Sequence, residues 1–242
     1  MSRPFEGVAI SFDLDGTLVD TAPDLVRSTN VVMDRAGLKP ISLASVRGMV
    51  GQGARALIIK AAAASGVTFG EDDLDNRIAH FLDVYQAGLT DLSLPFDGVA
   101  GTLTLLSSQG AILSVCTNKP PHLANPVLEA LGLNRHFKAV VGNGQAGVNK
   151  PDARHLTYTI EASGGNASRS LMVGDSITDV QAARNADIPV VLVSFGYTIE
   201  KASTLGADAV FDHYHELPEL ALRILAKYSA IDQRPVPLTQ PL

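Results

Sequence analysis

The sequence predicts an α/β protein whose parallel-sheet core carries an inserted, all-helical cap. Three observations support this fold class. Short apolar runs rich in Val and Ile alternate with segments of helical spacing, and one long interval near the N-terminus contains helical patterns only. The chain has 242 residues, of which 46% are hydrophobic, so it can bury one large core with a smaller unit beside it.

Five short apolar runs are expected to be buried parallel strands, because each ends abruptly in polar or glycine residues. These runs are 8–12, 111–116, 139–141, 171–173 and 190–193. A stripe of apolar residues from Leu123 to Leu131 predicts a helix that ends before Gly132. A second stripe, from Leu217 to Tyr228, predicts a helix over one face of the sheet.

The interval of about 21–91 contains no convincing strand. Pro23 suits the first turn of a helix that Gly37 closes. A later apolar stripe from Leu74 through Tyr85 repeats at spacings of three and four and is interpreted as ordinary core of the cap. Strands and helices alternate again after this interval, so it is interpreted as a helical insertion.

The predicted domain boundaries follow from this pattern. The core is expected to comprise 1–19 and 93–228, and the helical cap to comprise 20–92. The proline-containing segment 229–242 is expected to be a mobile tail.

Composition and charge exclude several partners and locations. A net charge of −6 without a long Lys/Arg run argues against nucleic acid and anionic membranes as partners. Residues 1–7 lack the pattern of a signal peptide, and no apolar run is long enough to span a bilayer, so a cytoplasmic protein is expected. Cys116, the single cysteine, lies in a strand run and is expected to be a buried thiol.

Two carboxylates, Asp13 and Asp15, stand where the first strand ends, and Gly16 behind them allows a sharp turn. Open α/β sheets bind ligands at that edge. Polar residues that follow the other strands are expected to converge on the same edge. They are Thr117 and Asn118 after the second strand, Lys150 after the third, and Asp175 and Asp179 after the fourth.

Such a cluster of carboxylates predicts a metal site. Neighbouring carboxylates raise at least one pKa among them unless a cation lies in their midst. Oxygen ligands without a His or Cys cluster suit Mg²⁺, which bridges to substrate phosphate. A carboxylate and a phosphate dianion repel by roughly 4 kcal/mol at ~4 Å, and Mg²⁺ together with Lys150 would offset this repulsion.

On these residues the sequence resembles the haloacid dehalogenase superfamily, in its phosphatase branch with a small helical cap of the C1 type and a Rossmann-like core. Four motifs match in order, each after a predicted strand, and they span almost the whole chain. The matching residues are Asp13, Asp15 and Thr17, then Thr117, then Lys150, and finally Gly174, Asp175, Ser176 and Asp179.

The resemblance implies a two-step mechanism. Asp13 would be the nucleophile that takes up the phosphoryl group, while Asp15 would protonate the departing alcohol and then activate water. Thr117 and Lys150 would hold phosphate oxygens. A halide leaving group needs no proton, so an acid at Asp15 indicates a phosphatase and not a dehalogenase.

The resemblance also implies the ligands of the metal and of the substrate. Mg²⁺ would be held by the carboxylates of Asp13 and Asp175 and by the backbone carbonyl of Asp15, with Asp179 supporting them directly or through water. The residues expected to contact the substrate are Gly16, Thr17, Asn118, Gly51, Gln52 and Gly53.

Within the phosphatases, the cap and its flanks resemble phosphoglycolate phosphatases in the stretches 20–25, 46–53 and 94–99. The glycine-containing turn 51–53 can bring backbone N–H groups close to a substrate carboxylate, and a plain turn between helices is an equally good interpretation. Arg47 and Arg55 are either carboxylate binders or solvated surface charges. His122 and His155 are interpreted as incidental, since the acid and base are already assigned.

The function expected is hydrolysis of a small phosphorylated metabolite, 2-phosphoglycolate in the first place, by a monomer or homodimer. A phosphatase or phosphomutase for sugar phosphates or nucleotides is the alternative within the superfamily. A regulatory protein that has kept the fold and lost turnover is the alternative of another class.

Overall fold

The computed structural model describes residues 3–232. Its core is a six-stranded sheet in the order β5-β4-β1-β6-β7-β8, and every neighbouring pair is parallel. The strands are β1 (Ala9–Phe12), β4 (Ile112–Cys116), β5 (Ala139–Val141), β6 (Ser170–Gly174), β7 (Val190–Val193) and β8 (Ala209–Phe211). The five predicted strands are present and the α/β class is confirmed. The edge strand β8 is not among the predicted strands, because its three residues are too few to stand out as an apolar run.

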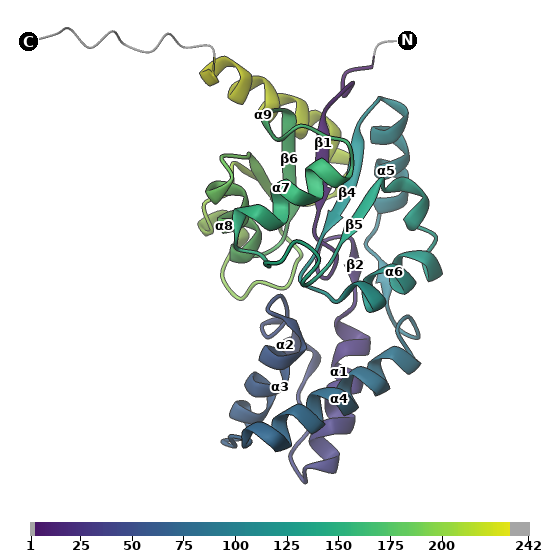
Figure 1. Ribbon diagram of the computed structural model, residues 1–242, viewed down its shortest axis with the longest axis vertical. Coiled ribbons are helices and arrows are strands. Elements are labelled where there is room, and N and C mark those ends of the chain that lie inside the picture. Colours follow the sequence, from purple (N-terminus) through teal and green to yellow (C-terminus); the bar gives the residue numbers. More distant parts are fainter. Residues whose placement is uncertain (1–2, 233–242) are drawn as a thin grey trace, which may run out of the picture.

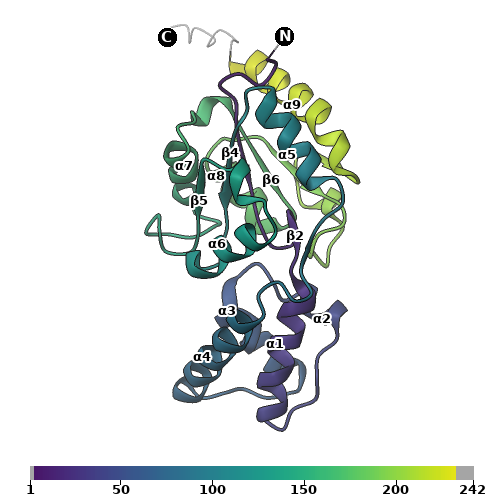
Figure 2. The ribbon, with the colours of Figure 1, turned by 90° about the vertical axis from the view of Figure 1, so that its right-hand side faces the viewer.

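Helices cover both faces of the sheet, with α5 and α9 on one face and α7 and α8 on the other (Figure 2). The helices of the core are α5 (Val99–Ser108), α6 (Pro121–Ala130), α7 (Ala153–Ala162), α8 (Ile177–Asn185) and α9 (Leu217–Asp232). Strand side chains alternate between the two layers. Ile10 and Phe12 of β1 belong to the hydrophobic cluster with α5 and α9, whereas Ala9 belongs to the cluster with α7 and α8.

A group of four helices lies beyond one end of the sheet (Figure 1). These helices are α1 (Ala22–Arg35), α2 (Leu43–Arg47), α3 (Gly53–Ala64) and α4 (Glu71–Ala87). The chain leaves the core through β2 (Val19–Asp20) and returns through β3 (Leu94–Pro95), and these two short strands pair antiparallel. The group is therefore inserted between β1 and α5, as predicted.

The helical insertion has a hydrophobic core of its own. Met33, Ile58 and Phe81 are buried in it, and Leu123 of α6 joins the same cluster from the core side. Pro23 stands in the first turn of α1, as predicted, because a helix needs no N–H from that position. The insertion thus folds as a packed unit that meets the core near the carboxyl ends of the strands.

At the C-terminal end, α9 covers the predicted stripe and continues to Asp232. It therefore extends four residues into the segment predicted to be a tail, and residues 233–242 lie outside the described residues. Within 3–232, none of the helices combines the length and the apolar character needed to cross a membrane. Cys116 is a fully buried free thiol, as predicted, and burial raises its pKa to about 11.

Candidate active site

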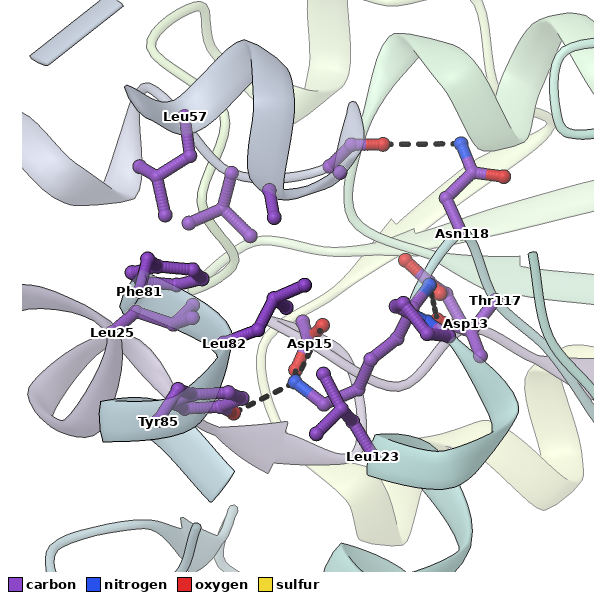
Figure 3. A pocket seen from close by; sticks show the side chains of 16 residues that line it. Asp13, Asp15, Leu25, Leu57, Phe81, Leu82, Tyr85, Thr117, Asn118 and Leu123 are labelled. Atoms are coloured by element: carbon purple, nitrogen blue, oxygen red, sulfur yellow. Dashed lines mark hydrogen bonds and ion pairs between the residues drawn. The ribbon is translucent and has the colours of Figure 1, made fainter. Parts of the chain in front are cut away.

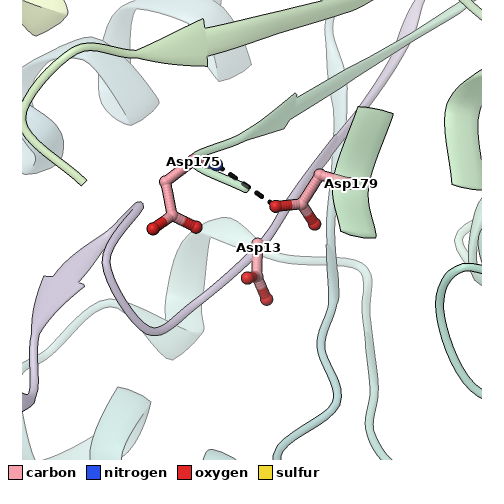
Figure 4. Close-up of side chains that lie close together, drawn as sticks. All are labelled: Asp13, Asp175 and Asp179. Atoms are coloured by element: carbon pink, nitrogen blue, oxygen red, sulfur yellow. Dashed lines mark hydrogen bonds between the residues drawn. The ribbon is translucent and has the colours of Figure 1, made fainter. Parts of the chain in front are cut away.

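Three carboxylates meet at the carboxyl ends of β1 and β6 (Figure 4). Asp13 follows β1, Asp175 follows β6, and Asp179 lies in the first turn of α8. All three are buried, and each offers an oxygen within 4.8 Å of the others. β1 and β6 are adjacent parallel strands that pair up to Phe12 and Val173, so their ends lie side by side. This adjacency produces the acidic cluster that the motifs predict.

Asp179 has both carboxylate oxygens engaged. Its Oδ2 accepts hydrogen bonds from the backbone N–H groups of Asp175 at 3.2 Å and Ser176 at 3.1 Å, and from the Ser176 hydroxyl at 2.8 Å. These bonds satisfy N–H groups that the start of α8 leaves without helical partners. Its Oδ1 accepts a bond from Lys150 Nζ at 2.7 Å. Asp179 therefore holds the Asp175 backbone and the Lys150 ammonium in place through these hydrogen bonds.

Asp175 is held by residues on either side of it. Its Oδ2 accepts the backbone N–H of Tyr197 at 2.7 Å, and the Thr17 hydroxyl donates to Oδ1 at 3.4 Å. Gly16 has φ +83°, and a Cβ at that position would lie 2.5 Å from Asp175 Oδ2. Gly16 and the fully buried Thr17 thus both lie against Asp175, and their predicted contact with substrate stays a prediction.

Lys150 places its ammonium between two carboxylates. Its Nζ lies 2.9 Å from Asp13 Oδ1 and 2.7 Å from Asp179 Oδ1, and its side chain is 2% exposed. Burial alone would lower the pKa of Lys150, but the two carboxylates raise it well above its ordinary value. The ammonium is therefore a fixed positive charge beside Asp13.

The backbone of Lys150 is clamped by two side chains. Its N–H donates to Asn118 Oδ1 at 3.0 Å and to His155 Nδ1 at 3.1 Å. His155 Nε2 lies 3.3 Å from the Val141 carbonyl, which assigns the proton of a neutral imidazole to Nε2. Burial, followed by the charge of Lys150, lowers the pKa of His155 to about 4. His155, interpreted from the sequence as incidental, therefore positions the loop that carries Lys150.

Asn118 lies at the boundary with the cap. It lines the pocket described below, as expected for a residue near substrate, but its amide is committed to backbone groups. Nδ2 donates to the carbonyls of Gly51 at 3.1 Å and Lys150 at 3.0 Å. Thr117, which precedes Asn118 at the end of β4, accepts the Lys119 N–H at its hydroxyl oxygen at 3.2 Å. The Thr117 hydroxyl proton remains available as a donor.

The electrostatics of the acidic cluster fit a divalent cation. Burial raises the pKa of Asp13 to about 6, with Lys150 opposing and Asp179 adding to the shift. Burial, then Asp179 and Asp13, raise the pKa of Asp175 well above its ordinary value. Asp13 Oδ1 is buried and accepts no hydrogen bond from the described residues, since Lys150 approaches it without hydrogen-bond alignment. Hard oxygen donors with an unsatisfied carboxylate match Mg²⁺.

Asp15 is not part of this cluster, and its carboxylate meets residues at the cap. It accepts the Thr21 hydroxyl at 2.7 Å and the Lys119 ammonium at 3.1 and 3.3 Å. Lys119 also donates to the hydroxyl of Tyr85 in α4 at 2.7 Å (Figure 3). Burial raises the pKa of Tyr85 to about 12, with Lys119 opposing, so the phenol stays protonated. The chain Asp15–Lys119–Tyr85 connects the core to the cap.

Neither Lys119 as a site residue nor the contact of Tyr85 with it is predicted from the sequence. A signal for Lys119 exists, because it follows Thr117 and Asn118 at the same strand end. Tyr85 belongs to an apolar stripe that predicts cap core, and it is indeed 1% exposed. Its hydroxyl meets Lys119 only through the packing of α4 against the core.

A pocket of about 50 Å³ that opens to solvent lies between the sheet edge and the cap (Figure 3). Its polar lining comes from Asp13, Asp15, Thr117, Asn118 and Lys119 of the core and Tyr85 of the cap. Its apolar lining includes Leu25, Leu57, Phe81, Leu82 and Leu123. The polar groups of the core thus face apolar side chains across the pocket, which is a common composition for a small-molecule site.

The turn 51–53 lies partly at this pocket. Gly51 and Gly53 line it and have φ values of +101° and +85°, whereas Gln52 lines a neighbouring hollow together with Asp175. Left-handed backbone of this kind favours glycine, which explains why two glycines flank one polar residue.

Two arginines considered as carboxylate binders have acidic partners and do not line the pocket. Arg47 pairs with Asp20 at 2.9 Å. Arg55 pairs with Glu71 and Asp75 on the exposed surface of the cap. Arg47 also lies over the Tyr197 ring at 5.8 Å from its centroid, and its buried Nε has no hydrogen-bond partner among the described residues.

The model of the haloacid dehalogenase-like hydrolase family matches residues 10–193, a segment that holds all four motifs. The chain belongs to this family. Its relatives include phosphoglycolate phosphatases of Caulobacter vibrioides, 45% identical over 93% of this chain and 94% of that protein, and of Agrobacterium fabrum, 46% identical over 95% and 98%. The N-acetylmuramic acid 6-phosphate phosphatase of Pseudomonas aeruginosa is 34% identical over 90% of this chain and 96% of that protein.

Solved structures agree with this membership. The crystal structure of a predicted phosphoglycolate phosphatase from Haemophilus somnus 129PT superposes with a TM-score of 0.83 at 30% identity. It covers 91% of this chain and 99% of that chain. The resemblance to phosphoglycolate phosphatases and the prediction of a phosphatase are thereby confirmed.

Proposed function

We propose that this member of the family is a Mg²⁺-dependent phosphomonoesterase that transfers the phosphoryl group of 2-phosphoglycolate first to Asp13 and then to water. The observation that carries the proposal is the buried Asp13 carboxylate, which has an oxygen without a hydrogen bond, lies beside Lys150 and faces the pocket. The similarity to two phosphoglycolate phosphatases over more than nine-tenths of the chain supports the substrate.

In the first step, Asp13 attacks phosphorus while the bond to the ester oxygen breaks. Lys150 and Thr117 hold phosphate oxygens and oppose the charge repulsion between the carboxylate and the phosphate. Asp15 gives its proton to the leaving alkoxide, which departs as glycolate. The product of this step is an aspartyl phosphate on Asp13.

In the second step, Asp15 takes a proton from water, which attacks phosphorus and breaks the bond to Asp13. Inorganic phosphate leaves, and both carboxylates return to their starting states. Mg²⁺, held by the carboxylates of Asp13 and Asp175 and the backbone carbonyl of Asp15, would supply positive charge to the phosphoryl oxygens. Asp179 would support these ligands, since its own oxygens are occupied by Lys150 and the start of α8.

We also infer a division of labour along the chain. Residues 1–19 and 93–228 would form the catalytic core, and 20–92 would act as a cap that admits and selects the ester. The hydrophobic cluster that the helical insertion forms mainly from its own residues and the two crossings at β2 and β3 support this division. The cytoplasm as location and a monomer or homodimer as assembly remain predictions.

A larger phosphate ester is a second candidate substrate. The pocket opens to solvent and has an apolar lining, and one relative is named for N-acetylmuramic acid 6-phosphate. A panel of a few dozen phosphate esters, including sugar phosphates and nucleotides, separates the candidates through kcat/KM. A flat profile in which 2-phosphoglycolate is not among the better substrates contradicts the leading assignment.

Metal dependence and the nucleophile need separate tests. Hydrolysis of 2-phosphoglycolate is expected with Mg²⁺ and lost in excess EDTA. Acid-quenched protein given ³²P-labelled ester is expected to retain label in the wild type and none in Asp13→Asn. A regulatory protein without turnover would bind the ester and release no phosphate, which the same assay detects.

A further inference from the structure

The cation best placed to recognise a substrate carboxylate is Lys119. Among the described residues that line the pocket, it alone carries a positive charge. Lys150 is occupied by Asp13 and Asp179, and the proposed chemistry assigns it to the phosphate. Lys119 is therefore the further cation available to the ester, and it lies at the end of the pocket where the leaving group must lie.

The position of Lys119 follows from its contact with Asp15. The leaving oxygen has to lie beside Asp15, which protonates it in the proposed reaction. Lys119 Nζ lies 3.1 and 3.3 Å from the two oxygens of Asp15, so it borders the same point. A carboxylate that is two covalent bonds away from the ester oxygen, as in a phosphorylated 2-hydroxy acid, arrives within reach of this ammonium.

The surroundings of Lys119 make this charge selective. Its side chain is 4% exposed, its Nζ lies 4.5 Å from the centroid of the Tyr85 ring, and the pocket that it lines is also lined by Phe81, Leu82 and Leu123. Electrostatic attraction is stronger where apolar walls exclude water. Without a cation, the two aspartates that line the pocket would repel a substrate carboxylate.

Lys119 has donor capacity for a second anion. An ammonium carries three N–H donors. Two contacts go to the same Asp15 carboxylate and one goes to the Tyr85 hydroxyl at 2.7 Å. One hydrogen bond to Asp15 is enough to keep the Lys119–Asp15 ion pair. The third N–H of the ammonium can then donate to the substrate while Tyr85 of the cap holds the ammonium in place.

We propose that Lys119, held by Tyr85, binds the carboxylate of the substrate and makes the enzyme selective for phosphate esters of short 2-hydroxy acids. The inference rests on the proposed function and adds its specificity residue. It replaces Arg47 and Arg55 in that role, because each of those arginines is paired with acidic side chains outside the pocket.

A substrate pair isolates the charge. 2-Phosphoglycolate and its amide have the same size, and they differ by the carboxylate charge. The wild type is expected to prefer the carboxylate by about 10- to 100-fold in kcat/KM, the range of a hydrogen bond to a charged group. In Lys119→Met this preference is expected to fall to about one, and Lys119→Arg is expected to keep part of it.

The carboxylate-to-amide ratio of kcat/KM, compared between the wild type and Lys119→Met, separates recognition of the carboxylate from support of Asp15. Any disturbance of Asp15 or of folding in Lys119→Met slows both esters alike and cancels in the comparison. Equal losses on both esters, with the wild-type preference intact, overturn the inference. Arg55→Met is the matched control, because it removes a cation from the cap surface, and it is expected to leave the preference for the carboxylate unchanged. Loss of that preference in Arg55→Met would also overturn the inference.

Binding measurements keep the two proposals apart. The two esters are titrated calorimetrically, with Mg²⁺, into Asp13→Asn and into Asp13→Asn combined with Lys119→Met. The first protein is expected to favour the carboxylate and the second to show no preference. If the wild type hydrolyses no ester, the proposed function fails, and this comparison still decides whether Lys119 recognises the carboxylate.

Discussion

The core side and the cap side of the pocket are built on different physical principles. On the core side, Asp13, Asp175, Asp179 and Lys150 are buried, and Lys150 forms short ion pairs with Asp13 and Asp179. On the cap side, the described residues that line the pocket are largely apolar, and Tyr85 is the polar side chain among them. The charged residues that would act on phosphate are thus held in place by their neighbours. The choice of substrate depends instead on the cap lining, which a few substitutions can alter.

Several side chains join the two sides. The Tyr197 hydroxyl accepts the Ala22 N–H and donates to Asp20, and the Thr21 hydroxyl donates to Asp15. Tyr85 reaches Lys119, and the Gly51 carbonyl accepts Asn118 Nδ2. Changes on the core side should therefore abolish chemistry, and changes on the cap side should alter preference.

The largest effect is expected from Asp13→Asn. An amide cannot form the phosphoenzyme, so kcat should fall by at least about 10⁴-fold. The substitution also removes a buried carboxylate whose pKa is raised to about 6, so thermal stability without Mg²⁺ should not decrease at pH 7.5. Turnover within about tenfold of the wild type would show that another group attacks phosphorus.

Lys150→Met is expected to lower kcat/KM by about 10²- to 10³-fold, because phosphate loses its fixed cation. It also leaves Asp13 and Asp179 without their shared partner. Breaking a buried pair costs about 3–5 kcal/mol, so the variant should unfold at lower urea in EDTA than the wild type. Asp152→Ala, at an exposed N-cap on the same loop, is the control for loop damage.

His155 is expected to make stability depend on pH. Its pKa is about 4 in the folded protein and about 6.5 when unfolded, so the unfolded chain binds more protons between these values. The contribution is fully present above pH 6.5 and is lost as the pH falls toward 4. At pH 5 the loss is at most about 2 kcal/mol relative to pH 7.5.

The comparison that isolates this contribution uses His155→Asn. The amide can accept the Lys150 N–H bond and does not titrate. The difference in urea unfolding free energy between wild type and variant should shrink or reverse from pH 7.5 to pH 5. Parallel pH profiles would assign the acid sensitivity to other groups.

Tyr85→Phe is expected to have a smaller effect, located at the contact between cap and core. It removes the hydroxyl that accepts from Lys119 and keeps the stacked contact with Phe81. KM for 2-phosphoglycolate should rise about 3- to 10-fold, with kcat changed less, as for loss of one hydrogen bond. An unchanged KM together with a lowered kcat would instead place Tyr85 in the chemical step.

The smallest effect is expected from Arg55→Met. Arg55 pairs with Glu71 and Asp75 where all three side chains are about half exposed or more. Exposed pairs of this kind contribute about 0–1 kcal/mol. Turnover and KM should stay within about twofold of the wild type, and a larger rise in KM would mean that the cap surface takes part in binding.

Much of the core side could be predicted from the sequence. A buried parallel strand has a clear apolar run, and its carboxyl end is where ligands of such sheets bind, so the order of the motifs already indicates that Asp13, Thr117, Lys150 and Asp175 converge. The edge strand β8 and the short pair β2–β3 have too few residues for a pattern to emerge. Their existence depends on neighbours that supply hydrogen bonds.

The sequence by itself determined the strand–helix alternation, the helical insertion and the residues that stand at the strand ends. The spacing of apolar residues and the order of the motifs can both be read directly from the sequence. Only the tertiary structure decided that Gly16 and Thr17 support Asp175, that His155 holds Lys150, and that Tyr85 and Asp15 share Lys119. The reason is physical. Each of these contacts joins side chains from elements that meet only after packing, and a side chain takes its partner from the space around it and not from its place in the sequence.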